Sequence, residues 1–427
     1  MYKTFMRALA WNSSMTFLYK IFLLMHQILL YSVISKTMYG LQSTLFAGIY
    51  VSIALTNFGF EETLLPFFST YLQSKQNFLQ IWVHFIGHII TIAIIALFIF
   101  GIMTHGSGEF LHNIQIYCNR NLIFVIALIF FIESIKKSII AMMQLAFLNK
   151  QIAFAEISML FIYIATVWGI YNAYGQLTIA AIFVPMLITS TVELCYLLYS
   201  LLNFYFKLPT NPIITEQIPF KNILIQRIYN YINQITKTMY SPNSMTILFA
   251  YLLGFQQAAT IKFFTNIITF CYTCISKTIG VTTGATFSAI NQMPLPVIRD
   301  FFQEITRRYF QMLLILSLLI IIIVGYSWYF SMISGIIASQ ILLFFTITML
   351  EYVTITYEQL FISQHAAKPL AQINIATFIA LIICGYMYQL NIIHYMGFIY
   401  LYFCIKIISL QAISFFANKR WAIPFQI

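Results

Sequence analysis

The chain has 427 residues, of which 61% are hydrophobic and only 8% are charged, and its mean hydropathy is +0.86. A water-soluble globular protein carries about 25% charged residues, so this composition excludes a soluble domain and indicates a protein that lies in a lipid bilayer. The net charge of +11 is expected to reflect basic residues in cytoplasmic loops and their attraction to anionic headgroups. No soluble basic domain offers a groove for nucleic acid, so we expect no nucleic-acid partner.

Apolar stretches that are long enough to span a bilayer recur along the whole chain. A spanning helix needs about 20 mainly apolar residues, and roughly twelve such stretches can be counted. The predicted helices cover residues 16–34, 44–68, 78–103, 122–148, 153–174 and 177–204, and then 223–253, 258–289, 309–330, 336–361, 370–389 and 392–416. The sequence therefore predicts an all-α polytopic membrane protein.

The distribution of polar segments predicts the topology and the division into lobes. The first apolar run contains Lys20 and lacks a small-residue cleavage site, so we expect a retained helix and not a signal peptide. Lysine and arginine collect in alternate loops, which predicts a multi-pass protein of the cytoplasmic (inner) membrane with both termini in the cytoplasm. The proline-containing stretch 203–222 suits a linker. We therefore expect a lobe over 1–206, a cytoplasmic linker over 207–222 and a second lobe over 223–427, with a further cytoplasmic loop over 291–308.

The two halves of the chain show signs of an internal repeat. Glu133 precedes Lys150 by the same spacing that separates Glu351 from Lys368, and one sequence shift relates both pairs. Parallel repeats of membrane helices allow a transporter to open its pathway alternately to either side. The sequence thus predicts two lobes of about six helices each, with the function located between them.

Polar side chains on the first helix of each half are the predicted lining of a central cavity. In the second half these polar residues are spaced by four, three and four positions, which places them on one face of the helix. The first helix of the chain is the repeat partner of that helix. The predicted substrate-binding residues are Asn12, Lys20 and Gln27 in the first half and Gln226, Asn230, Asn233 and Lys237 in the second. The alternative is that these side chains form hydrogen bonds between helices, each of which contributes about 0.6 to 2 kcal/mol to stability. Pro242 is expected to kink the second of these helices.

Carboxylates inside the predicted spans are the candidates for ion coupling, because ionisable groups in a bilayer are costly. The candidates are Glu61, Glu133 and Glu351, which would couple transport to a proton gradient, a sodium gradient or the membrane potential. Glu133 is expected to pair with Lys137, four residues further along the same helix. For Glu61 the alternatives are the membrane interface or a pair with Lys277, Lys262 or Lys20.

The sequence lacks the constellations that an enzyme would need. It contains no paired-carboxylate loop and no phosphate-binding glycine loop, so we expect neither an enzyme nor a bound cofactor. Cys271 with Cys274, and His84 with His88, have spacings that suit metal ligands. Neither pair is accompanied by further ligands, so no metal site is predicted.

One stretch resembles a known family signature. Tyr39-Gly40, an apolar helix and then Asn57-Phe58-Gly59 resemble the motif that opens the lipid-linked oligosaccharide flippases of the multidrug/oligosaccharidyl-lipid/polysaccharide (MOP) superfamily, and Leu252-Leu253-Gly254 is similar to its second-half counterpart. The resemblance implies a carrier that moves an isoprenoid pyrophosphate-linked glycan across the membrane by alternating access. It implies the bilayer, the lipid-linked glycan and the polymerase or glycosyltransferase machinery as partners, and Lys20 and Lys237 as ligands for the phosphates.

Two other functions remain open at this point. The first is a multidrug exporter of the same superfamily, which would be MATE-like, favour organic cations and couple to protons or sodium through Glu61, Glu133 or Glu351. The second is a membrane-embedded glycan ligase or polymerase, which usually needs a long outer loop; the longest one predicted here covers only residues 104–121.

Overall fold

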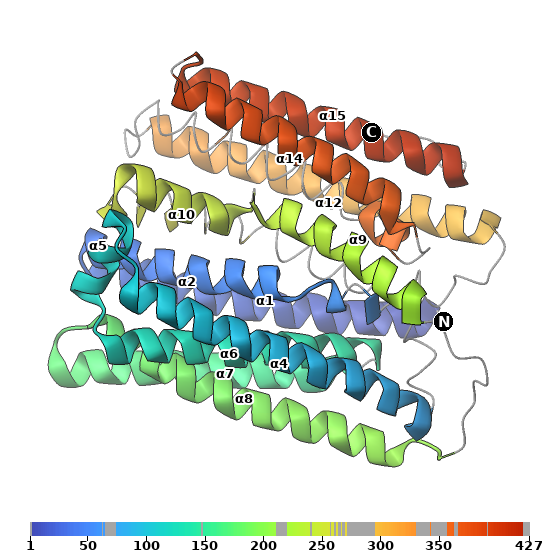
Figure 1. Ribbon diagram of the computed structural model, residues 1–427, viewed down its shortest axis with the longest axis horizontal. Helices are drawn as coiled ribbons and strands as arrows, with labels where there is room; N and C mark the ends of the chain where they lie inside the picture. The colour runs from blue at the N-terminus through green and yellow to red at the C-terminus, as the bar shows by residue number, and fades with distance from the viewer. Residues whose placement is uncertain are drawn as a thin grey trace.

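The computed structural model describes residues 2–61, 63–64, 74–146, 148–210, 220–239, 241–256, 258–259, 262–263, 266, 270, 295–329, 342, 357–362, 366–390 and 392–421. Every regular element in this described part is a helix (Figure 1). The first half contains α1 (Tyr2–Val33), α2 (Lys36–Thr56), α4 (Lys75–His105), α5 (Glu109–Tyr117), α6 (Arg120–Leu145), α7 (Asn149–Tyr174) and α8 (Ile179–Lys207). The second half contains α9 (Phe220–Met239), α10 (Pro242–Leu253), α12 (Leu295–Tyr329), α14 (Ala367–Gln389) and α15 (Tyr395–Trp421).

Six of these helices have the length and composition of membrane spans. Within the described residues, six segments are long and apolar enough to cross a bilayer: Lys36–Thr56, Ile81–His105, Asn149–Tyr174, Ile179–Lys207, Ala367–Tyr388 and Tyr400–Arg420. Many large apolar side chains on them point outward, such as Leu97, Ile188 and Ile382. In water such exposure would be unfavourable, whereas in lipid it is the expected surface. The predicted all-helical membrane fold is confirmed.

Local sequence explains where several helices begin and end. Side chains of Ser35, Asn119 and Thr178 precede α2, α6 and α8 and accept hydrogen bonds from backbone N–H groups three residues ahead, at 3.2, 2.9 and 3.2 Å. Each bond satisfies one of the four N–H groups that a helix start leaves without a partner. Gly175 ends α7 in the left-handed conformation, at φ +69°.

The helix starts preserve the register of the internal repeat. α1 begins at Tyr2 and α9 at Phe220, while α7 begins at Asn149 and α14 at Ala367, so one sequence shift relates both pairs. The counterpart of α1 is broken, however. α9 ends at Met239, and α10 starts at Pro242 with the hydroxyl of Ser241 as its cap. The single predicted helix over 223–253 is therefore two helices, because the backbone N–H that proline lacks can be lost without cost only at a helix start.

Other predicted boundaries need correction. The expected outer loop over 104–121 contains the short helix α5, and the expected cytoplasmic loop over 291–308 is helical from Leu295 onward. α1 begins at Tyr2, well before the predicted start at residue 16. At α1 and α12 polar residues continue the helix beyond its apolar part, and α5 is a separate helix too short to span a bilayer; a hydropathy pattern detects neither. Most of the predicted linker, residues 211–219, lies outside the described residues.

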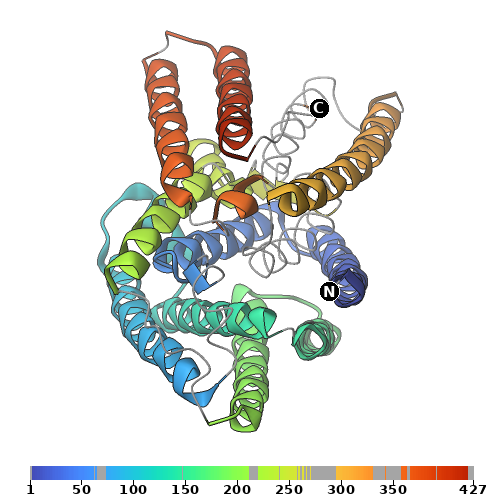
Figure 2. The same cartoon turned by 90° about the vertical axis from the view of Figure 1, so that its right-hand side faces the viewer.

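The two halves meet along α2. Figure 1 shows α9 and α10 in one broken line between the first-half helices and α12, α14 and α15, and Figure 2 shows the same arrangement from one end. Both α9 and α10 pack on α2. A Cβ on Gly40, near the start of α2, would overlap the backbone carbonyl of Phe255. Just beyond the end of α2, Arg227 Nε donates to the carbonyl of Phe58 at 2.8 Å. α2 is thus in contact with the second half at both of its ends.

Gly59 allows the close approach at the second of these ends. Its φ is +67°, and a Cβ there would lie 2.9 Å from the backbone nitrogen of Tyr231 and 3.1 Å from Cβ of Asn230. We expect Gly59→Ala to lower the free energy of unfolding by about 2 to 5 kcal/mol, since the left-handed conformation costs a non-glycine residue about 1 to 2 kcal/mol and overpacking costs about 1 to 3 kcal/mol. Denaturant titration of the purified protein in detergent measures this change.

The matched control for this prediction is Gly175→Ala. Gly175 has nearly the same φ, +69°, but a Cβ there would meet nothing within 4 Å. Its substitution should therefore show the backbone cost alone, about 1 to 2 kcal/mol. Equal effects of the two substitutions would mean that the contact of Gly59 with α9 contributes nothing to stability.

Candidate functional site

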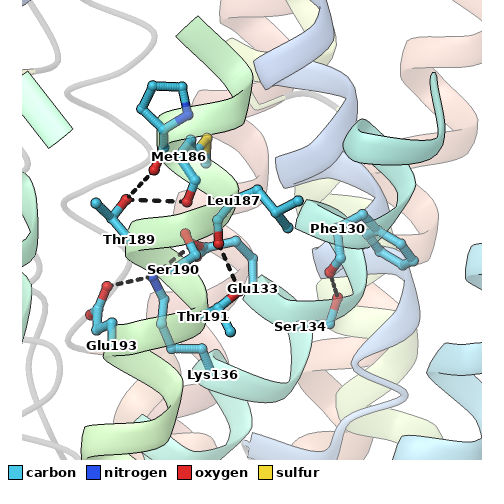
Figure 3. Close-up of polar contacts among 11 residues, drawn as sticks. Phe130, Glu133, Ser134, Lys136, Met186, Leu187, Thr189, Ser190, Thr191 and Glu193 are labelled. Carbon is cyan, nitrogen blue, oxygen red and sulfur yellow. Dashed lines mark hydrogen bonds and ion pairs between the residues drawn. The ribbon is translucent and has the colours of Figure 1, made fainter. Parts of the chain in front are cut away.

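Three charged side chains meet inside the first half, and we call Glu133, Lys136 and Glu193 the ion triad. Lys136 Nζ lies 2.7 Å from Glu133 Oε1 and 2.9 Å from Glu193 Oε2 (Figure 3). The hydroxyl of Ser190 donates a hydrogen bond to Glu133 Oε1 at 2.5 Å. One ammonium thus bridges two carboxylates, and a hydroxyl supports one of them.

The relative direction of two helices brings the triad together. The Ser190–Glu133 and Glu193–Lys136 contacts have the same sequence separation of 57 residues, as expected when α6 and α8 run parallel in a constant register. The two contacts lie about one helical turn apart on both helices, because residues i and i+3 share a face. Two neighbouring hydroxyl groups donate to backbone carbonyls and not to the carboxylates of the triad. Ser134 donates to the carbonyl of Phe130 at 2.8 Å and Thr189 to that of Pro185 at 2.9 Å, both within their own helices.

The triad is well buried and carries an excess of negative charge. The side chains of Glu133, Lys136 and Glu193 are 12%, 13% and 7% exposed. Glu193 Oε1 is buried and has no hydrogen-bond partner among the described residues. With both acids ionised, two negative charges face one positive charge. Tyr19, Tyr50 and Glu156 also lie within electrostatic range of the triad. The triad alone therefore has a net charge of −1 when both acids are ionised, and an ionised Glu156 would add another negative charge nearby.

The expected pair of Glu133 with Lys137 is wrong. Glu133 bonds Lys136 instead, and Lys137 Nζ lies 3.3 Å from Glu61 Oε2. On a helix both i+3 and i+4 lie within reach of residue i, and the choice depends on the neighbouring helices. Lys136 faces α8, where Glu193 provides a second carboxylate, whereas Lys137 is 43% exposed and lies beside Glu61. Lys137 was not among the three partners expected for Glu61, of which Lys277 lies outside the described residues.

The polar stripe of α9 is buried against both halves. Asn230 Nδ2 donates to Thr63 Oγ1 in the first half at 3.2 Å. Asn233 Nδ2 donates to the carbonyl of Ala367 at 3.4 Å, and Asn233 Oδ1 accepts from Asn374 at 2.8 Å. Gln226 is 7% exposed. These contacts are the interhelical hydrogen bonds that were the alternative to a cavity lining.

Lys237, at the end of the stripe, has a counterion. Its ammonium forms an ion pair with Glu358, and its side chain is 31% exposed. The positive charge that the sequence suggested for binding phosphate is therefore offset in this conformation. Glu358 was not among the predicted site residues, because its partner lies far away in the sequence and on a different helix.

A second lysine, Lys262, lies within electrostatic range of the predicted site residue Lys20 of α1. The ammonium of Lys262 donates to Asn243 Oδ1 at 3.1 Å. No described carboxylate pairs with Lys262. The next residue, Phe263, stacks on Tyr31 of α1 with ring centroids 4.3 Å apart. We call Lys20 and Lys262 the lysine pair; one lysine comes from each half.

Polar groups next to the lysine pair also bridge the halves. Gln27 Oε1 accepts a hydrogen bond from the Tyr39 hydroxyl at 3.0 Å, and Asn266 Nδ2 donates to the same hydroxyl at 3.4 Å. The bridge joins α1, α2 and the second half. Of the first-half candidates, Gln27 and Lys20 thus lie where the halves meet. Asn12 lies within α1, where the structure describes the backbone only, and Glu351 lies outside the described residues.

Sequence reasoning missed Lys262 and Glu193 as site residues. Lys262 stands alone in an apolar stretch, and its repeat counterpart, Thr44, is uncharged. A lysine in a predicted span is a signal of function in itself, and it could have been used. Glu193 has no evident partner in the sequence, since only the parallel register of α6 and α8 reveals Lys136. Among the described residues, no group of three side chains suits a metal ion.

Solved structures with the same fold are membrane transporters. A multidrug resistance MATE family transporter of the MOP superfamily, in an outward-facing conformation, matches with a TM-score of 0.71 and 12% identity over 97% of this chain and 95% of that chain. The MATE multidrug transporter DinF-BH matches with a TM-score of 0.72 and 11% identity over 100% and 97% of the two chains. No protein-family model and no curated protein matches the sequence.

A third match concerns a MOP superfamily transporter from Pyrococcus furiosus, with a TM-score of 0.67 and 11% identity over 97% of this chain and 95% of that chain. It is described as having a binding pocket of reverse polarity that suggests a different function. At these identities the likeness is one of fold. The chain has the fold of MATE transporters over nearly its whole length.

Proposed function

We propose that this protein is a membrane transporter that works by alternating access and carries a cargo with an anionic headgroup. The cargo that best suits the sequence resemblance and the site is an isoprenoid pyrophosphate-linked oligosaccharide. The fold supports transport, because the solved structures that share it are transporters. The charge of the groups between the halves supports an anionic cargo.

The lysine pair is the observation that carries this proposal. A lysine in the hydrocarbon region costs about 2.5 to 3.5 kcal/mol on insertion scales, and two like charges in range of each other add to that cost. Lys262 has a neutral amide as its hydrogen-bond partner and no described counterion. A pyrophosphate between the two ammonium groups would form charge-assisted hydrogen bonds with both. Because one lysine comes from each half, bound cargo would also connect the halves.

The contacts along α2 indicate how such a cargo could move. α2 touches the second half near Gly40 at one end and near Gly59 at the other. Cargo held between the halves can leave only if one of these contacts opens while the other stays closed, which is the requirement of alternating access. The isoprenoid chain would remain in the bilayer beside the apolar outer faces of the helices, and only the headgroup would pass between the halves.

A cation-coupled multidrug exporter is the second candidate, and the ion triad favours it. The two acids of the triad have one ammonium between them, as a site that takes up a proton would have. Two of the solved transporters with this fold are described as multidrug transporters. This function predicts that Glu133→Gln abolishes the efflux of an organic cation from everted vesicles. Unaltered efflux would argue against it.

Binding to purified protein distinguishes the two candidates. We expect Lys262→Gln to weaken the binding of a short-chain isoprenyl pyrophosphate disaccharide about tenfold to a hundredfold, since a hydrogen bond to a charged group contributes about 1.5 to 3 kcal/mol. Lys207→Gln is the matched control, because Lys207 lies exposed in the last turn of α8. Isothermal calorimetry in detergent gives the affinities.

The opposite pattern would overturn the proposal. If Lys20→Gln with Lys262→Gln leaves the affinity for the pyrophosphate unchanged in folded protein, the lysine pair is not the anion site. If the wild type binds a lipophilic organic cation and fails to bind the pyrophosphate, the multidrug function is favoured instead.

A further inference from the structure

The ion triad has the oxygen ligands of a cation site, and the ammonium of Lys136 lies where a bound cation would be. Glu133 and Glu193 supply carboxylate oxygens from two helices, and the Ser190 hydroxyl lies 2.5 Å from Glu133 Oε1. Carboxylate and hydroxyl oxygens are the ligands that hard metal cations prefer. The position between the two carboxylates is filled by the ammonium of Lys136, at 2.7 and 2.9 Å (Figure 3).

The acceptors in this cluster exceed what one ammonium uses. The whole Glu193 residue is 5% exposed, yet its Oε1 accepts no hydrogen bond from the described residues. A buried carboxylate oxygen without a partner is costly and calls for an explanation. Glu156 on α7 lies within electrostatic range of Glu193, and Tyr19 on α1 and Tyr50 on α2 lie within range of both triad acids. These negative and polar surroundings favour a positive group at the position between the two carboxylates.

We infer that Lys136 is a tethered cation that occupies a monovalent metal-cation site and so keeps sodium out of the carboxylate cluster. The ammonium cannot diffuse away, so it competes with dissolved ions at a very high effective concentration. A sodium ion between the same carboxylates would lie next to it, and the repulsion is strong where the dielectric is low. Lys136 therefore determines which ions this site accepts. Sodium enters only when the ammonium is removed.

A purely structural ion pair is the competing explanation, and it makes a different prediction. Such a pair would lose stability on substitution of Lys136, and no dissolved ion would restore it. A cation site lacking its tethered cation should instead take up a small cation from solution. Sodium and methylammonium are suitable probes, because one is a metal cation and the other reproduces the end of the lysine side chain.

The experiment measures the midpoint of thermal unfolding in detergent as sodium chloride replaces choline chloride at constant ionic strength. For Lys136→Ala we expect a saturable rise of about 5 °C. The wild type and the control Lys137→Ala, whose lysine pairs with Glu61 outside the triad, should change by less than about 1 °C because no site opens. Lys136→Ala combined with Glu193→Gln should lose the rise.

Each remaining outcome decides against the inference. A saturable rise in the wild type equal to that of Lys136→Ala would show that Lys136 does not exclude sodium, and folded Lys136→Ala without a rise would show that no site exists. If Lys136→Ala is recovered unfolded, purification in methylammonium should restore it; failure with both sodium and methylammonium would overturn the inference. A role of the ion triad in ion coupling would rest on the proposed transport function. The unfolding measurements use no cargo, so the inference about Lys136 and the proposed function can each fail without the other.

Discussion

Replacing Lys136 by alanine should lower the free energy of unfolding in sodium-free buffer by about 3 to 5 kcal/mol, because it leaves two buried carboxylates without their ammonium. The side chains concerned are at most 13% exposed, so solvent cannot replace the lost partner. Unfolding of the purified protein in a denaturing detergent titration measures the loss.

Lys137→Ala is the matched comparison for this change. Lys137 is the next residue on α6 and also forms an ion pair, with Glu61, but it is 43% exposed. An exposed pair contributes no more than about 1 kcal/mol. A loss for Lys136→Ala no larger than that for Lys137→Ala would mean that the ion triad does not hold α6 and α8 together.

Gly40→Ala should reduce transport at least about tenfold for each molecule of folded protein in the membrane. The added Cβ would lie 2.6 Å from the backbone carbonyl carbon of Phe255. A backbone group cannot rotate out of the way as a side chain can, so the contact between the halves at this end of α2 could not close. A protein that cannot close one end cannot complete the alternating cycle.

Gly48→Ala is the control for this second prediction. Gly48 lies two turns further along α2, and a Cβ there would meet nothing within 4 Å. Transport in cells, divided by the amount of protein in the membrane fraction, should be near that of the wild type for Gly48→Ala. Equal rates for the two variants would show that the contact between Gly40 and Phe255 takes no part in the cycle.

Much of the fold could be predicted from the sequence, because membrane helices are determined by runs of apolar residues that hydropathy detects. The repeat was also visible, since Glu133 and Glu351 are related by the same shift as the starts of α7 and α14. The break between α9 and α10 was predicted only as a kink. Pro242 marks the position, but whether a helix bends or ends there depends on a cap such as Ser241.

The site was predicted less completely than the fold. Glu133, Lys20 and Gln27 were proposed as site residues because polar groups in a span require a reason, and their roles stay predictions. Their partners could not be read from the sequence. Glu193 reaches Lys136 only through the parallel register of α6 and α8, and Lys262 approaches Lys20 only when the two halves pack together. Contacts between helices distant in sequence are set by packing, which periodicity within one helix does not contain.

The central claim, that the two halves move an anionic lipid-linked headgroup past the lysine pair, is tested most directly in liposomes that contain the purified protein. A fluorescent isoprenyl pyrophosphate oligosaccharide is placed in both leaflets, and its accessibility to an external enzyme that cleaves the glycan is followed over time. We expect the wild type to make the inner pool accessible and the double variant Lys20→Gln, Lys262→Gln to leave it protected. Equal rates for the two proteins, or no movement of the glycan by the wild type, would contradict the account.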